Sequence, residues 1–156
     1  MLEGTMQDVT SEQAHWIPGG KALAAGATYA HITLAEDFFL NMTVGRQPLA
    51  TTAFAGKMGL SEPHPTGGDW EAWAQSVKID LPTLREYAGA VFKSTEEYAS
   101  SLKAEDLDRE IDLTSSGLGK QTLGSFISLI AIVHPSSHCG EISCLKGLQG
   151  AKGYPF

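Results

Sequence analysis

The stretch from Gln121 to Leu148, QTLGSFISLIAIVHPSSHCGEISCLKGL, carries the most informative helical pattern of the chain. Apolar residues and histidines recur in it every three or four positions, which is the spacing of one face of an α-helix. Gly150 is placed to end this helix. Pro135 removes one backbone hydrogen bond, but the apolar period continues in phase, which favours a kink over a break. The inward face comprises Leu123, Ile127, Ile130, His134, His138, Glu141 and Leu145.

Two further stretches have the same period. Residues Lys21 to about Val44 predict a long helix with one inward stripe, and Leu81 to Leu102 predict another, with Pro82 suited to its first turn. Residues 1–14 predict the end of a short helix, which a Pro- and Gly-containing turn at 15–20 follows. The stripe of the 21–44 helix comprises Leu23, Ala27, His31, Leu34 and Phe38.

The segments between these helices are rich in turn residues. Gly45 to Gly68 carries many Gly and Pro residues and predicts a long loop, after which Asp69 is a plausible N-cap of a brief helix. Residues 106–113 suggest a short extended segment and 115–119 a turn. Together, these patterns predict an all-α four-helix bundle, with the long loop and a short extra helix between its second and third helices. We expect residues 1–156 to form one domain.

Composition narrows the classes of partner and location. With 11 basic against 18 acidic residues, the net charge is −7, and no basic cluster offsets it, so we expect no nucleic-acid partner. The longest apolar run, Phe126 to Val133, is far shorter than the roughly 20 residues of a membrane span. The first residues show no secretory signal pattern, and Cys139 and Cys144 point to different helix faces. We therefore expect free thiols, a cytoplasmic location and no membrane partner.

Three histidines are the candidate metal ligands. His134 and His138 are four residues apart, so on one helix both imidazoles can reach one ion. His31 lies on the apolar stripe of another helix. Three histidines with an open fourth position describe a catalytic metal site, in which the ion activates water or a thiol or polarises a carbonyl. An inward histidine is more often a hydrogen-bonded core residue, so the residues alone leave metal binding and a structural role about equally open.

Other polar residues near these positions have competing interpretations. Glu141 lies one turn beyond His138 and can orient an imidazole, serve as a fourth ligand or act as a base, or it can form a salt bridge or interface contact. Cys139 points away from His138, which favours a buried structural thiol. Glu36 and Asp37 lie on other faces than His31, so a solvated or interhelical role is expected for both. We assign no chemistry to His15 and His64, and we expect Trp16 to be a packing anchor.

With these residues in place, nearly the whole chain resembles the DinB-like superfamily, the four-helix-bundle proteins that include YfiT-type metal hydrolases and thiol-dependent transferases. The resemblance rests on three segments, namely residues 13–19 (QAHWIPG), residues 29–32 (YAHI) with Glu36-Asp37 after them, and the closing run from His134 to Ile142. Pro135 and Cys139 depart from the family pattern, and the first helix is short. The resemblance implies that His31, His134 and His138 bind the metal.

The resemblance also implies a nickel or zinc ion, a homodimer and the activation of a small-molecule thiol such as mycothiol or bacillithiol. The leading hypothesis is therefore a metal-dependent thiol transferase or hydrolase. The alternative is a non-catalytic dimeric bundle, a stress-related or interaction protein, with a structural or vestigial metal site. A ferritin-like di-iron protein needs two Glu-x-x-His motifs, and the sequence has only Glu12-x-x-His15, beside a Pro turn.

Overall fold

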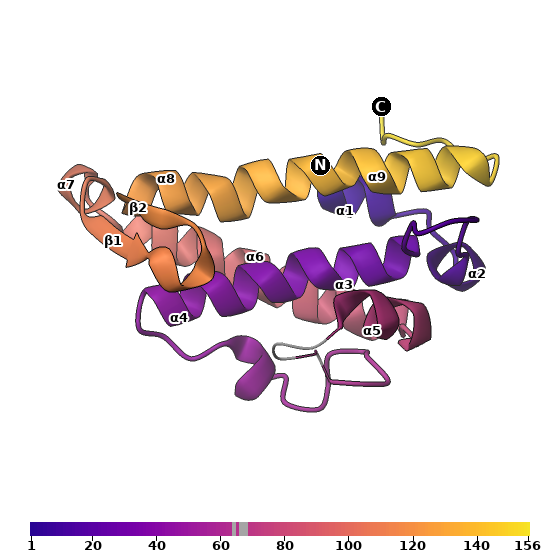
Figure 1. Cartoon of the computed structure of the whole chain (residues 1–156), viewed down its shortest axis with the longest axis horizontal. Coiled ribbons are helices and arrows are strands. Elements are labelled where there is room, and N and C mark those ends of the chain that lie inside the picture. Colours follow the sequence, from indigo (N-terminus) through magenta and orange to yellow (C-terminus); the bar gives the residue numbers. More distant parts are fainter. Residues whose placement is uncertain (64, 66–68) are drawn as a thin grey trace.

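The computed structural model describes residues 1–63, 65 and 69–156. Long helical segments run side by side and form the body of the molecule (Figure 1). In two of these segments a π-helical turn lies between two α-helical parts, and the helix continues through it without a break. These segments are α3 (Ala25–Ala35) with the π turn η1 (Glu36–Leu40) and α4 (Asn41–Thr43), then α6 (Leu81–Ser101), and finally α8 (Leu123–Ser128) with the π turn η4 (Leu129–Val133) and α9 (His134–Leu148).

Two short helices, α1 (Leu2–Met6) and α2 (Ser11–His15), take the fourth position of the bundle. The predicted helical bundle is thus confirmed, with its first helix in two pieces. Helix α1 packs against α9 and α2 against α3. The buried ammonium of Lys146 donates to the carbonyl of Thr5 at 2.7 Å and to the carboxylate of Asp8 at 2.5 Å. The guanidinium of Arg85 donates to the carbonyl of Met6, so α1 is tied to both α9 and α6.

Helix α3 is the central element of the bundle. Every residue of Ala25–Ala35 except His31 is buried, so this helix has no solvated face. It begins at Ala25 and not at the expected Lys21, because residues 21–24 continue the turn that Pro18 and Gly20 open. A Cβ at Gly26 would lie 2.9 Å from the carbonyl oxygen of Ala14, so glycine is needed where α3 crosses α2.

The last helix runs from Leu123 to Leu148, two residues shorter at its start than expected. The Thr122 hydroxyl caps it by accepting a hydrogen bond from the backbone N–H of Ser125 at 3.2 Å. The helix continues through Pro135, as expected, and the π turn η4 ends at Val133, two residues before it. Because a π turn shifts backbone bonding by one residue, we attribute the tolerance of Pro135 to this wider turn.

The connections combine short helices with one small hairpin. Strands β1 (Glu110–Leu113) and β2 (Gly119–Thr122) pair antiparallel, with Glu110 opposite Thr122, and the 3-10 turn η3 (Thr114–Ser116) joins them. The expectation of an extended segment at 106–113 holds only for β1, because residues 104–107 form the short helix α7 (Ala104–Leu107). Strand β2 was not predicted.

The long loop after α4 contains the 3-10 turn η2 (Leu49–Thr51), and part of it lies outside the described residues. Helix α5 (Trp70–Ser76) follows, and the carboxylate of Asp69 accepts from the backbone N–H of Ala72 at 3.0 Å, which confirms the predicted N-cap. Within the described part of the chain, no helix is both long and apolar enough to cross a membrane.

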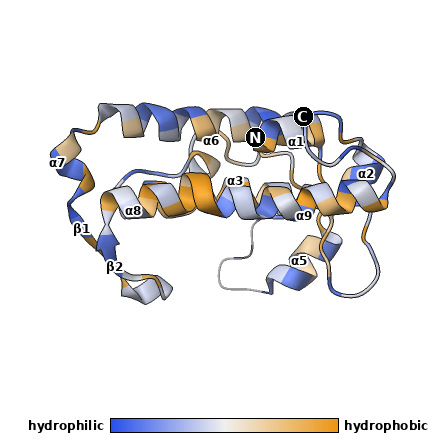
Figure 2. Cartoon of the chain, turned by 90° about the horizontal axis from the view of Figure 1, so that it is seen from above, coloured by the Kyte–Doolittle hydropathy of each residue, from blue (hydrophilic) through white to orange (hydrophobic). Residues whose placement is uncertain are grey.

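The main core lies between the long helices and includes the buried side chains of Tyr29, Leu84, Tyr87 and Ile142. A smaller apolar cluster around Phe126 closes the end of the bundle next to the hairpin. Figure 2 shows a strongly hydrophobic stretch of the last helix between the labels α8 and α9, where η4 lies.

Candidate metal centre

The three candidate ligands meet between α3 and α9. His31 projects from the middle of α3, and His134 and His138 lie on successive turns of α9. The Nε2 atom of His134 is 3.1 Å from that of His31 and 3.2 Å from that of His138. One nitrogen from each residue lies within 4.8 Å of the other two. The structure therefore brings together the three residues that the sequence selected.

These separations match the donor set of a tetrahedral metal site. Zn–N bonds of about 2.0–2.1 Å at tetrahedral angles separate two ligand nitrogens by about 3.3–3.4 Å. The two separations at His134 are within a few tenths of an ångström of that value. Three imidazoles from two helices also leave a fourth position for an exogenous ligand.

Hydrogen bonding alone does not account for the cluster. An imidazole Nε2 atom either carries one proton or offers one lone pair. The Nε2 atom of His134 has two nitrogen neighbours at hydrogen-bonding distance, so it can satisfy only one of them well. A cation at the centre would accept a lone pair from each of the three residues, so the arrangement is compatible with a metal site.

Glu141 contacts one of the histidines. Its carboxylate oxygen lies 2.7 Å from Nδ1 of His138, while the glutamate side chain itself remains largely exposed. When the N–H group at Nδ1 donates a hydrogen bond to this carboxylate, Nε2 of His138 keeps its lone pair and points to the other two histidines. This contact fits the orienting interpretation of Glu141 and also the salt-bridge alternative, since it would be an ion pair with a protonated His138.

The surroundings of His134 favour its neutral form. Burial lowers its pKa, the proximity of His138 lowers it further, and the charge of Glu141 opposes both effects. Neutral imidazole is the form that binds a metal. The Nδ1 atom of His134 is buried and has no hydrogen-bond partner in the described part of the chain, so this ligand lacks the outer support that His138 receives.

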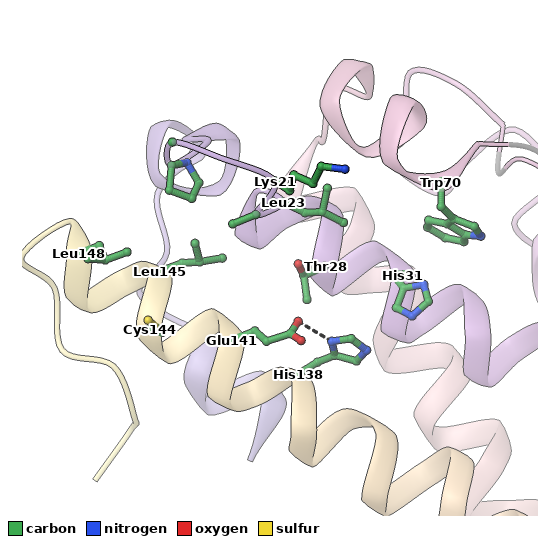
Figure 3. Close-up of a pocket in the computed structure, with 13 residues that line it drawn as sticks. Lys21, Leu23, Thr28, His31, Trp70, His138, Glu141, Cys144, Leu145 and Leu148 are labelled. Carbon is green, nitrogen blue, oxygen red and sulfur yellow. Dashed lines mark hydrogen bonds and ion pairs between the residues drawn. The ribbon is translucent and has the colours of Figure 1, made fainter.

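A cavity of about 670 Å³ opens beside the cluster (Figure 3). His31 and His138 line one end of it, and Glu141 and Thr28 lie between them and the rest of the cavity. The remaining walls are mainly apolar, so a small molecule bound here would be partly shielded from water. They include Pro18, Ala22, Leu23, Trp70, Leu145 and Leu148.

Two residues of this cavity were missed by sequence reasoning. The ring of Trp70 meets the ring of His31 edge to face, with centroids 4.7 Å apart. Cys144 is exposed and lines the cavity on the α9 side. The spacing of Cys144 from His138 along the last helix was available in the sequence, but no local pattern places the start of α5 against α3.

The neighbouring cysteine and acids occupy other positions. Cys139 is fully buried and unpaired, and burial raises its pKa, which agrees with the expected structural thiol. Glu36 and Asp37 are also buried, so the solvated alternative for them is wrong. The carboxylate of Asp37 accepts from the backbone N–H groups of Leu49 and Ala50 and from Tyr87, which makes its role interhelical.

The residues to which no chemistry was assigned have structural roles where they are described. Nε2 of His15 accepts from the backbone N–H of Ile79 at 2.9 Å, and its Nδ1 lies 2.7 Å from the carbonyl of Ser11. Trp16 packs against the main core, which confirms its prediction as an anchor. His64 lies outside the described residues.

Comparisons with known proteins agree with this architecture. The model of a family described as the DinB superfamily matches residues 1–142. A solved structure, described as a conserved protein from Enterococcus faecalis, is similar at a TM-score of 0.70 over 94% of this chain and 89% of that one, with 22% identity. At that identity the likeness concerns the fold alone. No curated protein gave a significant match.

Proposed function

The chain belongs to the DinB superfamily, and on that premise we propose that it is a metal-dependent enzyme. In this proposal His31, His134 and His138 hold one zinc or nickel ion, and a small-molecule thiol or a water molecule is activated in the adjoining cavity. The reaction is a transfer to, or a hydrolysis of, a small electrophile bound in that cavity.

The observation that carries the proposal is the cluster of three histidines, in which the Nε2 atom of His134 lies 3.1 and 3.2 Å from those of His31 and His138, close to the separation of two ligands of a tetrahedral ion. A closed structural site would bury its ion on all sides. Here two of the three histidines also line the cavity of about 670 Å³, which favours a catalytic site over the non-catalytic alternative.

The chain's own residues have defined roles in this proposal. Glu141 fixes the ring of His138 and its tautomer, and burial favours the neutral form of His134. Trp70 supports His31 from the side, and the apolar walls limit access of water to the reacting groups. When bound, a divalent ion lowers the pKa of a coordinated thiol or water and so supplies a nucleophile near neutral pH.

The family resemblance supports a homodimer and a thiol substrate. The two unpaired cysteines support a cytoplasmic location, where thiols remain reduced. Sedimentation analysis of the purified protein would test the dimer directly.

Elemental analysis of the untagged protein beside its His134→Ala variant is the decisive experiment. We expect about one zinc or nickel ion per chain in the wild type and loss of that ion in the variant, with helical content unchanged by circular dichroism. His15→Ala is the matched control, because that histidine lies outside the cluster, and it should retain the ion. Glu141→Gln should weaken metal affinity about 10–100-fold, because it weakens the support of a ligand.

A metal-loaded protein would then be screened for conjugation of low-molecular-weight thiols to electrophiles. Absence of metal in the wild type, even after incubation with zinc and nickel salts, would contradict the proposal and favour the non-catalytic bundle. Retention of one ion by His31→Ala, His134→Ala and His138→Ala alike would show that the ion binds elsewhere.

A further inference from the structure

A second cavity of about 660 Å³ shares no lining residue with the metal-site cavity. It lies between α1, α6 and the last helix, and we call it the α6 groove. Its α9 lining comes from Pro135, Ser136 and Cys139, whereas the metal-site cavity is lined by His138, Glu141 and residues further along that helix. The two cavities therefore meet different faces of α9.

Glu36 lines the α6 groove and differs from its neighbour Asp37 in its partners. Both carboxyls are buried, with 3% exposure at Glu36 and none at Asp37. Asp37 accepts from two backbone N–H groups, from the hydroxyl of Tyr87 and from the amide of Asn41. The hydroxyl of Thr95 lies beside Glu36 and lowers its pKa. A carboxylate offers about four acceptor positions, so Glu36 retains capacity for a further donor.

The backbone at the α6 groove is irregular on both sides. The π turn η1 begins at Glu36 itself, and the π turn η4 contributes Ala131 and Ile132 to the lining. The two turns pack against each other. Single π turns inside α-helices are uncommon and occur frequently at functional sites. Both π turns lie at the cavity and beside the buried carboxyl of Glu36, and this observation does not depend on the charge of that carboxyl.

The lining of the α6 groove combines apolar walls with negative charge. Phe92, Ile127 and Ile132 supply much of the apolar surface, and Glu3 and Glu96 are the other acidic residues. Glu3 accepts a hydrogen bond from the hydroxyl of Tyr29 at 2.6 Å, and Glu96 is exposed at the rim. The described lining residues include no Lys, Arg or His side chain. The α-ammonium of Met1 also faces this groove, where it acts on Cys139, and it is not among the groups that shift the pKa of Glu36.

We propose that the α6 groove is a binding site for a small organic cation, an amine whose apolar body lies against the groove and whose ammonium group pairs with Glu36. An ammonium supplies both the missing donors and the compensating charge for a buried carboxylate. A neutral alcohol supplies one donor and no charge, and an anion is repelled. This proposal does not depend on the metal centre.

Isothermal titration calorimetry with three probes of equal chain length tests the proposal: hexylamine, hexanol and hexanoate. We expect saturable binding of hexylamine that exceeds the binding of hexanol at least tenfold, and no binding of hexanoate. Glu36→Gln should abolish the preference for the amine over the alcohol. Glu97→Gln removes an exposed carboxyl of α6 outside the groove and should leave the preference intact. The His134→Ala variant should bind hexylamine as the wild type does, which separates this site from the metal centre.

The pH dependence gives a second readout. Burial raises the pKa of Glu36 to about 7, with the Thr95 hydroxyl opposing that shift and the charge of Asp37 adding to it. A hexylamine ammonium stays protonated well above this range. Its affinity should therefore fall about tenfold from pH 8 to pH 6, as Glu36 takes up a proton.

Three results would overturn the proposal. The first is equal affinity for hexylamine in the wild type and in Glu36→Gln. The second is the absence of saturable binding of any amine by the folded protein. The Ala131→Trp variant, whose new side chain would fill the α6 groove, serves as the reference for a blocked site. The third is a stable dimer in which cross-linking places a second copy over Ile132, because that copy would occupy the groove.

Discussion

At the scale of single residues, Asp37 and Glu36 are adjacent carboxyls with different surroundings. Asp37 joins three parts of the fold, because it is part of the central helical segment and accepts from the turn at Leu49 and Ala50 and from Tyr87 on α6. Burial and the charge of Asp37 raise the pKa of Tyr87, so that its hydroxyl remains a donor.

Replacing Asp37 with Asn should therefore be strongly destabilising. The amide keeps one acceptor oxygen but turns an NH2 group toward buried donors, so at least one N–H or O–H loses its partner. We expect the free energy of unfolding to fall by about 3 kcal/mol or more, as measured by urea denaturation. Glu36→Gln is the matched control, the same chemical change one residue earlier, and it should not destabilise the protein. Similar losses in both variants would refute the distinction.

Glu36 should make stability depend on pH. Its pKa rises from 4.5 to about 7 on folding, so the folded state holds the proton more tightly. The contribution of Glu36 to the free energy of unfolding is therefore fully present below pH 4.5. The free energy of unfolding falls by about 3 kcal/mol in total as the pH rises to 7. We expect Glu36→Gln to lack this loss, so its stability relative to the wild type should increase between pH 5 and pH 8. A difference that stays constant with pH would contradict the assignment.

At the scale of elements, sequence periodicity predicted the long helices because apolar residues recur every three or four positions in each of them. It did not predict the π turns. The extra residue of η4 shifts the buried face of the last helix by one position, from Phe126 and Ile130 before it to Pro135 and Cys139 after it, and an unbroken helical period does not show this shift.

Periodicity placed Glu36 and Asp37 on other faces than His31. A residue on another face is exposed only if that face meets solvent, and the helix formed by α3 and η1 is buried on several sides. Strand β2 was missed because its four residues, GKQT, carry no apolar alternation.

Some residues of the candidate metal centre were likewise predictable from the sequence and others were not. His31, His134 and His138 were predictable, because helical spacing puts them on inward faces. Trp70 was not, because its approach to His31 depends on the path of the long loop that precedes it, and local patterns do not determine such a path.

Helix α5 connects the cap at Asp69 to the site through Trp70. Asp69→Ala removes the hydrogen bond to the backbone N–H of Ala72 and should destabilise α5 by about 1 kcal/mol. Since Trp70 contacts His31, metal affinity should fall at most about fivefold. Hydrogen exchange of the α5 amides and metal titration would measure the two effects. Gln75→Ala, a substitution of an exposed residue in the same helix, should change neither the exchange rates nor the metal affinity. Faster exchange of the α5 amides in that control would invalidate the comparison.

At the scale of the whole molecule, the proposed ion joins α3 to α9 across the bundle. The bundle does not require it to fold, because the main core includes fully buried side chains from α3, α6 and α9 away from the three histidines. The protein without metal should therefore keep its helical content at 25 °C, unlike small domains whose folding depends on a zinc ion.

Metal binding should nevertheless raise the thermal stability, because an ion that binds only the folded state adds to the free energy of unfolding. At a free metal concentration of about 1,000 times the Kd, the gain is about 4 kcal/mol. For a chain of 156 residues this corresponds to a rise in Tm of about 8–16 °C. Scanning calorimetry of chelator-treated and zinc-loaded protein measures it, and His134→Ala should show no rise. Unfolding of the chelator-treated wild type at 25 °C would instead assign the ion a structural role, because the core would then be insufficient without it.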